Sequence, residues 1–373
     1  MWQDVLAAQR DTTRAARSAH QAYWRATGSA CRPRISNRED ELKKVIIEKY
    51  GVPQEAVRCI DAPDPGPPAA DEIVFDVLAH PINPADLSLL MGRYAVSPPL
   101  PVTPGAECIG RIVAVGGAVC DLAVGDRVIN LSRENWAQRR RVKAVEAIRV
   151  RTDIPVAQAA MLRINPHTAL LLLEDIVTLA PGEWLVQNGA NSAVGKILIG
   201  LARERGVRTV NVLRRPELAD QLLAWGADAV VADGPGLAER IRSAAGGAPV
   251  RYAIDCVGGA ATAHMAEAVA DGGTVCNYGG LSGEASQMPN HALVYRGVSL
   301  TGFMLGRFLG RRTRDAITAL YARLADRIAE GKIDVPVEKI YAIEDIREAV
   351  AHAAAYGRAG KILIAPNGRD AWD

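Results

Sequence analysis

A short segment of the chain has the residue types and spacing of an anion-binding turn. Residues 184–186 are strand formers that follow a Pro-Gly pair, Gly189 permits a sharp turn, and Gly195 lets a following helix lie close to a sheet. Free amide groups at the start of such a helix favour an anion, usually a pyrophosphate. The strand–turn–helix context therefore indicates a dinucleotide site. However, Asn191 and Ser192 stand where a glycine pair is expected, and an ordinary strand-to-helix turn is the alternative.

Two arginines follow the next predicted strand. Arg214 and Arg215 lie about 20 residues past the glycines, where an NAD site usually has an acid for the ribose 2′-hydroxyl. The next acid is only Glu217. A guanidinium binds a 2′-phosphate through charge-assisted and often bidentate hydrogen bonds. The pair thus favours NADP over NAD, with a solvated pair at a strand end as the alternative.

Metal and nucleophile chemistry have little support. Glu107 precedes Cys108, but no histidine adjoins it, and His80 and His167 are isolated. A zinc site needs three or four nitrogen, sulfur or oxygen ligands in a recognisable arrangement. No Gly-x-Ser-x-Gly elbow is present either. We therefore expect no metal.

A nicotinamide enzyme without zinc or a nucleophile must polarise its substrate by hydrogen bonding. Tyr94 is a candidate donor, since it follows the flexible Gly92 and precedes a proline-stiffened loop. Taken alone, a tyrosine in this context is more often a packing residue. Asn83 is likewise more often only a turn former.

Composition limits the class of protein. The chain has 373 residues, a net charge of +2 and a hydrophobic fraction of 49%, which fits two domains with full-sized cores. The small net charge gives no case for nucleic acid or membrane binding, and no apolar run reaches the ~18 residues of a transmembrane helix. The six cysteines include no C-x-x-C pair, and most lie in apolar runs. They indicate reduced cysteines of a cytosolic-type compartment.

The hydrophobic pattern changes type along the chain. Residues 41–160 contain many short strands punctuated by Gly and Pro, which predicts a barrel-like β domain. From residue 184 strands and helices alternate, which predicts a doubly wound parallel sheet. The predicted strands of this part are 185–187, 209–213, 229–231, 252–256, 273–278 and 298–304. The predicted helices are 156–162, 168–179, one that follows the Gly189 turn and ends at Glu204, 216–225, 236–245, 260–269, 314–330 and 343–356. A β-rich tail containing strands 339–341 and 361–364 is expected to return to the first domain.

Residues 1–40 stand apart from both patterns. They are rich in arginine and poor in acids before Glu39. Such a segment resembles an organelle transit peptide. A disordered or helical extension and upstream sequence from a wrong start are the alternatives.

The whole of 41–366 resembles the zinc-free part of the medium-chain dehydrogenase/reductase superfamily. Residues 104–107 (Pro-Gly-Ala-Glu) and 125–128 (Gly-Asp-Arg-Val) are general marks of the superfamily. Narrower marks resemble the mitochondrial-type trans-2-enoyl thioester reductases; they are 50–53, 83–87, 92–94, 165–169, 187–195, 211–214, 278–281 and 302–305. Residues 187–195 are the most specific, because related quinone reductases usually carry glycine pairs at Asn191 and Ser192.

The resemblance implies an α/β fold with two domains and an N-terminal extension at 1–40. A GroES-like β-rich catalytic domain would comprise 41–164 and 311–373, and a Rossmann NADPH-binding domain would comprise 165–310. The resemblance also implies a homodimer and places the family's catalytic tyrosine on Tyr94. It implies cofactor contacts at Asn165, Thr168, Asn191, Ser192, Ala193, Val194, Arg214, Arg215, Tyr278, Gly279, Gly280, Leu281, Phe303, Met304, Leu305 and Lys361. Asn83, Trp136, Met304 and Arg307 are candidate substrate contacts.

Three departures from the family pattern affect the acyl pocket and the phosphate site. Met304 stands where the family commonly has tryptophan. The segment that contains Trp136 runs into three arginines at 139–141. The loop after Arg214 is shortened, since Arg215 and Pro216 follow directly. Acyl-chain preference and the details of phosphate binding therefore stay open.

The expected reaction is NADPH-dependent reduction of the C2=C3 bond of a 2-enoyl thioester carried by CoA or acyl carrier protein. Tyr94 would hydrogen-bond the thioester oxygen or donate a proton to Cα. A basic run that contains Arg307, Arg311, Arg312 and Arg314 would attract carrier phosphates, with a solvated helix start as the alternative.

Two other functions stay open at this point. One is a quinone or enone reductase of the same superfamily, and the other is a non-catalytic NADPH-binding protein. The expected location is cytoplasmic, or the mitochondrial matrix if residues 1–40 are a transit peptide.

Overall fold

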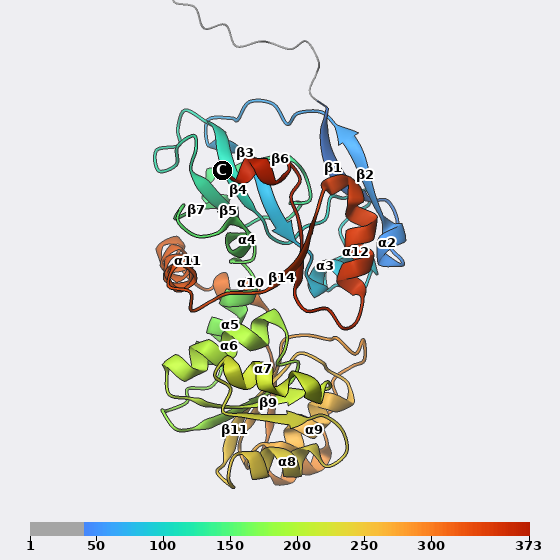
Figure 1. Cartoon of the computed structure of the whole chain (residues 1–373), viewed down its shortest axis with the longest axis vertical. Helices are drawn as coiled ribbons and strands as arrows, with labels where there is room; N and C mark the ends of the chain where they lie inside the picture. The colour runs from blue at the N-terminus through green and yellow to red at the C-terminus, as the bar shows by residue number, and fades with distance from the viewer. Residues whose placement is uncertain (1–40) are drawn as a thin grey trace, which may run out of the picture. The chain divides into compact units, whose positions relative to one another are not determined.

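The computed structural model describes residues 41–373. The N-terminal extension considered above, residues 1–40, lies outside the described residues. Glu41–Asp373 form one compact unit with three β-sheets (Figure 1).

The first part of this unit is rich in short strands, as its Gly/Pro punctuation predicts. Its strands are β1 (Leu42–Ile47), β2 (Val57–Ala62), β3 (Glu72–Pro81), β4 (Ile109–Val115), β5 (Arg127–Asn130), β6 (Arg139–Lys143) and β7 (Ala147–Val150). Two short helices, α2 (Pro53–Ala56) and α3 (Pro84–Leu90), and the 3-10 turn η1 (Ala144–Glu146) connect them. β1 pairs with β2, and a seven-stranded sheet has the order β14-β15-β3-β4-β5-β7, with β6 paired to β3.

The C-terminal strands return to this first sheet, as the sequence predicted. β14 (Val337–Tyr341) runs parallel to β15 (Lys361–Ile364), and β15 pairs antiparallel with β3, where Ile364 lies opposite His80. The red β14 and α12 accordingly lie with the blue and cyan strands in Figure 1.

A six-stranded parallel sheet forms the second part. Its strands are β8 (Trp184–Gln187), β9 (Arg208–Leu213), β10 (Ala229–Ala232), β11 (Val250–Asp255), β12 (Thr274–Asn277) and β13 (Ser299–Gly302). Their order is β10-β9-β8-β11-β12-β13, and every neighbouring pair is parallel. The strand order reverses between β8 and β11, which is where a doubly wound sheet binds its ligand. The predicted fold class, a GroES-like β-rich domain with a Rossmann-type sheet, is confirmed.

The helices match the predicted periodicity closely. They are α4 (Val156–Ala159), α5 (Asn165–Glu174), α6 (Ala193–Glu204), α7 (Ala219–Ala224), α8 (Leu237–Ala244), α9 (Ala260–Ala268), α10 (Leu305–Leu309), α11 (Arg314–Ala329) and α12 (Ile346–Ala354). The 3-10 turns are η2 (Pro216–Leu218), η4 (Ile343–Asp345) and η5 (Arg369–Trp372), and η3 (His291–Tyr295) is a π-helix.

Several predicted boundaries were wrong. α4 ends at Ala159 and not at residue 162, and α5 ends at Glu174 and not at residue 179. α5 begins at Asn165, three residues before the predicted start, because Pro166 sits in its first turn, where proline is well tolerated. The predicted strand 298–304 ends at Gly302, and the next residues begin α10, which the sequence did not predict.

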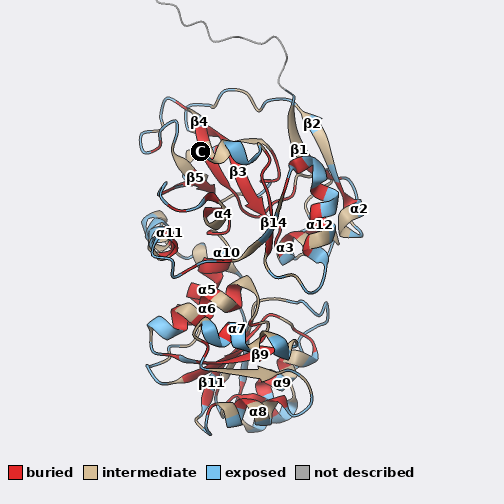
Figure 2. Cartoon of the chain, viewed as in Figure 1, coloured by how far each residue is buried: buried red, intermediate tan, exposed pale blue. Residues whose placement is uncertain are grey.

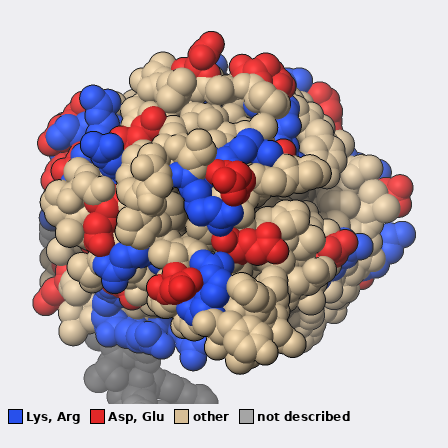
Figure 3. All heavy atoms as spheres, turned by 90° about the horizontal axis from the view of Figure 1, so that it is seen from below, with Lys and Arg blue, Asp and Glu red and all other residues tan. Residues whose placement is uncertain are grey.

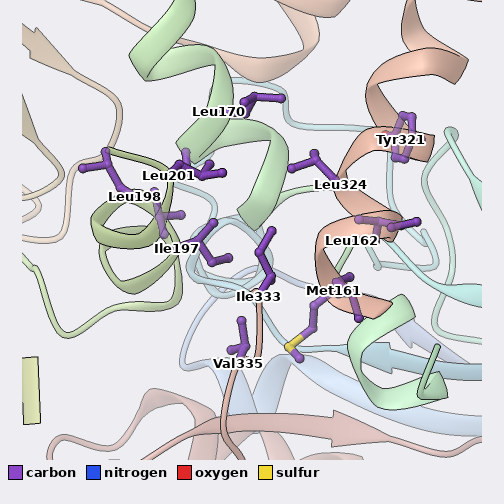
Figure 4. Close-up of a cluster of buried hydrophobic side chains, with 14 of the residues drawn as sticks. Met161, Leu162, Leu170, Ile197, Leu198, Leu201, Tyr321, Leu324, Ile333 and Val335 are labelled. Atoms are coloured by element: carbon purple, nitrogen blue, oxygen red, sulfur yellow. The ribbon is translucent and has the colours of Figure 1, made fainter. Parts of the chain in front are cut away.

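Apolar side chains from distant segments form the largest core. Figure 2 shows α5 and the central parallel strands as largely buried. In Figure 4, Leu170 of α5, Leu201 of α6 and Leu324 of α11 point toward one another, and Ile333 and Val335 lie below them. Because α5 and α6 share this core, the turn before α6 has a fixed scaffold.

Candidate cofactor and substrate site

The turn between β8 and α6 has the geometry that the glycines predicted. Gly189 has φ +57, and a Cβ there would lie 2.4 Å from the Cys256 sulfur. A Cβ on Gly195 would lie 2.5 Å from the Ala190 carbonyl oxygen. Larger residues would therefore push helix and sheet apart at this turn.

The first turn of α6 offers free donors to an anion. The Ser192 hydroxyl caps the helix by accepting from the Gly195 amide at 3.1 Å, and the Ser192 carbonyl accepts from Lys196. The amides of Ala193 and Val194 remain as the helix's N-terminal donors. Ser192 is thus a helix cap first, and only its own hydroxyl proton is left for a ligand.

Three cations gather beyond β9. Arg214 is exposed and stacks over the Tyr356 ring at 5.6 Å, and Arg215 donates to the Gly357 carbonyl at 3.3 Å. Lys196 lies over the Trp225 ring at 4.0 Å. Burial and the nearby Arg215 lower the pKa of Lys196 to about 8.

No carboxylate neutralises these three cations. Within residues 41–373, none of them takes part in an ion pair. An unneutralised cation cluster at the end of the second strand suits a phosphate dianion. The sequence singled out Arg214 and Arg215 but not Lys196, whose only signal was its place one residue after Gly195.

A shallow hollow adjoins Arg214. It is lined by Arg214, Asp233, Gly234, Ala261 and His264, which come from the ends of β9 and β10 and the start of α9. Ligands of doubly wound sheets bind outside the carboxyl ends of the strands. The hollow is therefore placed where the adenosine half of a dinucleotide would lie.

Asp255 fixes the carboxyl end of β11. Its buried carboxylate accepts from Asn188, Thr262 and Asn277 at 2.6, 2.6 and 3.0 Å. Burial raises its pKa, but these hydrogen bonds outweigh burial and the net pKa is lowered. A charged Asp255 therefore ties the turn after β8 to the turns after β11 and β12.

The predicted contacts at 278–281 follow β12 directly. Tyr278 lies near Ser192 and Cys256, and burial with the neighbouring Cys256 raises its pKa. A Cβ on Gly279 would meet the Cys256 carbonyl at 2.7 Å, so glycine is required there. Gly280 is exposed, as is Leu281, whose amide donates to the Cys256 carbonyl at 3.2 Å.

The contacts predicted at 303–305 lie at the end of β13. Phe303 is buried and packs on Phe308 with ring centroids 4.6 Å apart. Met304 is 54% exposed and precedes α10, which begins with the half-buried Leu305. Met304 is therefore free to contact a ligand.

The basic run around α10 divides into two groups. Arg312 donates to both carboxylate oxygens of Asp175, and Arg314 donates to backbone carbonyls at 145 and 147. These two arginines are structural. Arg307 is exposed, and Arg311 lies over the Phe308 ring, so only these two remain as candidates for carrier phosphates.

A buried polar network lies under the β-rich part of the site. Asn83 donates to one oxygen of Glu107 at 2.8 Å and accepts from the Lys361 ammonium at 2.5 Å. The other Glu107 oxygen accepts from the Ile164 amide at 2.9 Å, immediately before α5. Burial raises the pKa of Glu107 to about 7 and lowers that of Lys361 to about 8. Asn83 is thus buried and bridges Glu107 and Lys361. Its interpretation as a turn former did not predict this role.

Asn165 and Thr168 stand on the first turns of α5, and both are buried. The Asn165 side-chain nitrogen has no hydrogen-bond partner within the described residues. A buried donor without a partner is costly, and a carbonyl oxygen of a ligand would satisfy it.

Tyr94 lies half-buried in the loop after α3. Its hydroxyl oxygen accepts a hydrogen bond from Arg133 at 2.7 Å. Gly92, with φ +69, lies against the Tyr50 ring and shapes the loop. Arg133 was not predicted from the sequence, because nothing local links it to a residue 39 positions away.

Trp136 is placed differently from the prediction. It is 0% exposed, stacks on His80 with centroids 5.5 Å apart, and belongs to the core of the β-rich part. A side chain without exposed surface cannot contact a substrate, so Trp136 is not part of the substrate site. The tryptophan's size and its place beside Gly105 explain its role as a packing residue.

Three further features bear on metals, membranes and charged partners: clusters of possible metal ligands, long apolar helices and surface charge. Residues 41–373 contain no group of three His, Cys, Asp or Glu side chains arranged to hold a metal ion. No helix in this range is long and apolar enough to cross a membrane. On the face in Figure 3, basic and acidic side chains are interspersed, so this face presents no field of one sign.

The residues present fit an NADP-type dinucleotide. The glycine turn and free amides suit a pyrophosphate, the cation cluster suits a 2′-phosphate, and unpartnered Asn165 marks a ligand-facing polar group. Tyr94 supplies a hydrogen-bond donor on the β-rich part. Hydride transfer to a polarised double bond is chemistry that such a set supports.

Comparisons with known proteins agree with this geometry. The family model of the alcohol dehydrogenase GroES-like domain matches residues 69–148, and that of the zinc-binding dehydrogenases matches 193–326. A mitochondrial enoyl-acyl-carrier-protein reductase of Xenopus tropicalis is 34% identical over 316 residues, covering 82% of this chain and 90% of that protein.

Solved structures share the fold. A Bacillus thuringiensis protein assigned as an NADPH:quinone reductase has TM-score 0.81 at 25% identity, covering 87% of this chain and 99% of that one. A mitochondrial 2-enoyl thioester reductase heterodimer of Candida tropicalis has TM-score 0.78 at 23% identity, with the same coverage. Both branches that the sequence left open are therefore among the structural neighbours.

Proposed function

Since this chain belongs to the family of the mitochondrial enoyl-acyl-carrier-protein reductases, within the medium-chain dehydrogenase/reductase superfamily, we propose that it reduces 2-enoyl thioesters with NADPH. The observation that carries the proposal is the combination of an unneutralised 2′-phosphate site at Arg214 with a hydrogen-bond donor at Tyr94. The first selects the reductant and the second polarises the acceptor.

The cofactor residues have separate tasks in this proposal. Ala193 and Val194 bind the pyrophosphate through their amides, with Asn191 and Ser192 beside them. Arg214, Arg215 and Lys196 hold the 2′-phosphate, because they carry no competing carboxylate.

The nicotinamide half is held by residues from several elements. Asn165 and Thr168 of α5, residues 278–281, residues 303–305 and Lys361 form this half of the site. The Lys361 ammonium group is held in place by Asn83, which in turn donates a hydrogen bond to Glu107. Bound NADPH supplies the hydride that the substrate's Cβ receives.

Tyr94 acts on the thioester. As Cβ receives hydride, the electron pair of the C2=C3 bond moves toward the carbonyl, and negative charge develops on the thioester oxygen. A hydrogen bond aimed at that oxygen lowers the barrier. Cα then takes a proton, either from Tyr94 or from solvent, and the product is the saturated thioester.

Carrier and acyl-chain contacts complete the proposed site. Arg307 and Arg311 are exposed cations that suit the phosphates of CoA or the acidic surface of an acyl carrier protein. Met304 is exposed immediately before α10, at the position where the family commonly has tryptophan. Met304→Trp should change the acyl-chain preference and leave the KM for NADPH unaltered.

A substrate panel tests the proposal against quinone or enone reduction, which the Bacillus thuringiensis neighbour keeps as the second candidate. Crotonyl-CoA, a longer 2-enoyl-CoA, an enoyl-acyl carrier protein and a small quinone are each assayed with NADPH and NADH. We expect NADPH-dependent turnover of the thioesters and a large loss of kcat in Tyr94→Phe. Strong quinone turnover without enoyl thioester reduction would show that the protein is a quinone or enone reductase. NADPH binding without any turnover would favour a non-catalytic protein.

The assembly proposed is a homodimer. β13 is the edge strand of the parallel sheet, and all four of its residues are exposed. Val294 and Tyr295 just before it are 66% and 80% exposed. An uncovered edge strand with apolar neighbours is a surface that a second copy would pair with. Light scattering on the wild type and on Leu300→Lys tests this, since the substitution should yield monomers.

The compartment and the domain boundaries are also proposals. The curated relative is named mitochondrial, which supports the matrix over the cytoplasmic location that cysteine usage indicates. Fusion of residues 1–40 to a fluorescent reporter tests this directly. Domain boundaries at 164/165 and 310/311 are proposed because all strands of the parallel sheet lie between them, and limited proteolysis would locate the boundaries.

A further inference from the structure

Arg133 is in direct contact with Tyr94. One guanidinium nitrogen donates to the Tyr94 hydroxyl oxygen at 2.7 Å, and the guanidinium carbon lies 4.7 Å from the centre of the Tyr94 ring. The same cation therefore holds both the oxygen and the ring face. We propose that Arg133 is a positioning residue that holds the Tyr94 phenol and directs its proton to the substrate. This inference rests on the proposed enoyl thioester reductase function.

The direction of this hydrogen bond is fixed by chemistry. A guanidinium has five N–H donors, no acceptor, and stays protonated in proteins, whereas a phenol has one donor and acceptor lone pairs. Tyr94 must therefore accept from Arg133. Its single O–H proton is left to point away from Arg133, toward a ligand.

The cation also acts on the charge that Tyr94 acquires. If Tyr94 gives its proton to Cα, the O–H bond breaks, the C–H bond forms, and a phenolate remains until water returns a proton. If Tyr94 only hydrogen-bonds the thioester oxygen, its own oxygen gains partial negative charge. In both cases a charge-assisted hydrogen bond to that oxygen is stronger in the transition state than in the ground state.

The backbone around Arg133 is held on both sides. The Asn130 carboxamide accepts from the amide and hydroxyl of Ser132, and it donates to Asn135 at 2.7 Å. The Arg133 carbonyl accepts from Arg140 at 3.2 Å. Asn130 and Asn135 are both fully buried. The side chain thus extends from a fixed base toward Tyr94.

Within residues 41–373, Arg133 forms no ion pair with a carboxylate. The adjacent Glu134 pairs with Arg140 at 3.2 Å. Arg133 also acts on the buried carboxyl of Asp86. Burial raises the pKa of Asp86, and the hydrogen bonds to its oxygens and the charge of Arg133 offset part of that increase. The guanidinium is therefore available to Tyr94.

A double-mutant cycle tests the proposal. The variants are Arg133→Leu, Arg133→Lys, Tyr94→Phe and the Arg133→Leu/Tyr94→Phe pair, assayed with crotonyl-CoA and NADPH. Binding of butyryl-CoA is measured by calorimetry in parallel. Arg149→Leu is the matched control, because Arg149, in strand β7 of the β-rich part, is also exposed and approaches a carboxylate, that of Asp126, only at 3.9 Å.

We expect Arg133→Leu to lower kcat about 10- to 100-fold, the range for a hydrogen bond to a charged group. Butyryl-CoA affinity and the KM for NADPH should change less than about 2-fold, and Arg133→Lys should recover part of kcat. In the Tyr94→Phe background, Arg133→Leu should cost less than about 2-fold, because the two residues act as a unit. The control should match the wild type.

Other results overturn specific claims. An equal loss from Arg133→Leu in both backgrounds, or a loss seen only in KM and butyryl-CoA affinity, would show that Arg133 contacts the carrier and not Tyr94. Wild-type kcat in Tyr94→Phe would remove Tyr94 from the mechanism and this inference with it. Absence of enoyl-CoA turnover in the wild type would instead overturn the proposed function.

Discussion

Replacing Arg214 with leucine should convert a strong preference for NADPH into a weak one. Arg214 is exposed at the end of β9 and stacks on the Tyr356 ring at 5.6 Å. Leucine keeps apolar contact with that ring and removes the charge. The KM for NADPH should therefore rise, while the KM for NADH, which lacks the 2′-phosphate, should stay within about 2-fold.

The size of the effect follows from the exposure of Arg214. A fully exposed ion pair contributes about 0.2–1 kcal/mol, whereas a hydrogen bond to a charged group away from water contributes about 1.5–3 kcal/mol. Arg214 lies between these limits, because it is exposed but ordered by the ring. We expect about 1–2 kcal/mol, or roughly a 5- to 30-fold increase in the KM for NADPH.

Steady-state kinetics with both nucleotides at saturating crotonyl-CoA measures the effect. Arg208→Leu is the matched control, since Arg208 starts the same strand at its opposite end and also stacks on an aromatic ring, Trp184, at 5.5 Å. The control should leave both KM values unchanged. Equal increases for NADPH and NADH in Arg214→Leu would refute the 2′-phosphate site.

Four further predictions concern the same site and its support. Asn191→Gly with Ser192→Gly should raise the Kd for NADPH, which a fluorescence titration measures; an unchanged Kd would show that only backbone amides bind the phosphates. Lys196 has a pKa lowered to about 8, so its attraction for the 2′-phosphate is present at pH 7 and lost as pH rises above 8. Lys196→Met should remove that pH dependence of the KM for NADPH, and a persisting dependence would exclude Lys196. Burial raises the pKa of Glu107 to about 7, so the folded state binds this proton more tightly than the unfolded state. Stability should fall by roughly 3 kcal/mol as pH rises from about 4.5 to 7, and Glu107→Gln should flatten this slope in urea unfolding; an unaltered slope would contradict the assignment. Trp136→Ala should lower the free energy of unfolding by about 3–5 kcal/mol without changing acyl-chain preference, and a changed preference in the folded variant would return Trp136 to the substrate site.

The sequence predicted the parallel sheet well because its signals are local. Gly189 and Gly195 permit a turn and a close helix, and the strands predicted at 185–187 and 209–213 match β8 and β9. Arg214 and Arg215 could be placed because strand ends in a doubly wound sheet meet at one edge. The missed helix α10 has only five residues, too few for a periodic signal.

The contacts that support the β-rich part of the site could not be predicted, because they join distant residues. Lys361 reaches Asn83 across 278 positions, and Arg133 reaches Tyr94 across 39. Trp136 was expected near the substrate because its segment resembles that of the family, but packing against His80 decides its position. The Lys361–Asn83 contact depends on the register in which β15 pairs with β3, and no local pattern specifies that register.

The central claim is hydride transfer from NADPH to Cβ of a 2-enoyl thioester. Crotonyl-CoA is incubated with the protein and NADPH deuterated at the transferring position, and the product is analysed by mass spectrometry and NMR. The account predicts butyryl-CoA with one deuterium at C3. Recovery of unreduced crotonyl-CoA, while a parallel incubation with a quinone consumes the labelled NADPH, would contradict it.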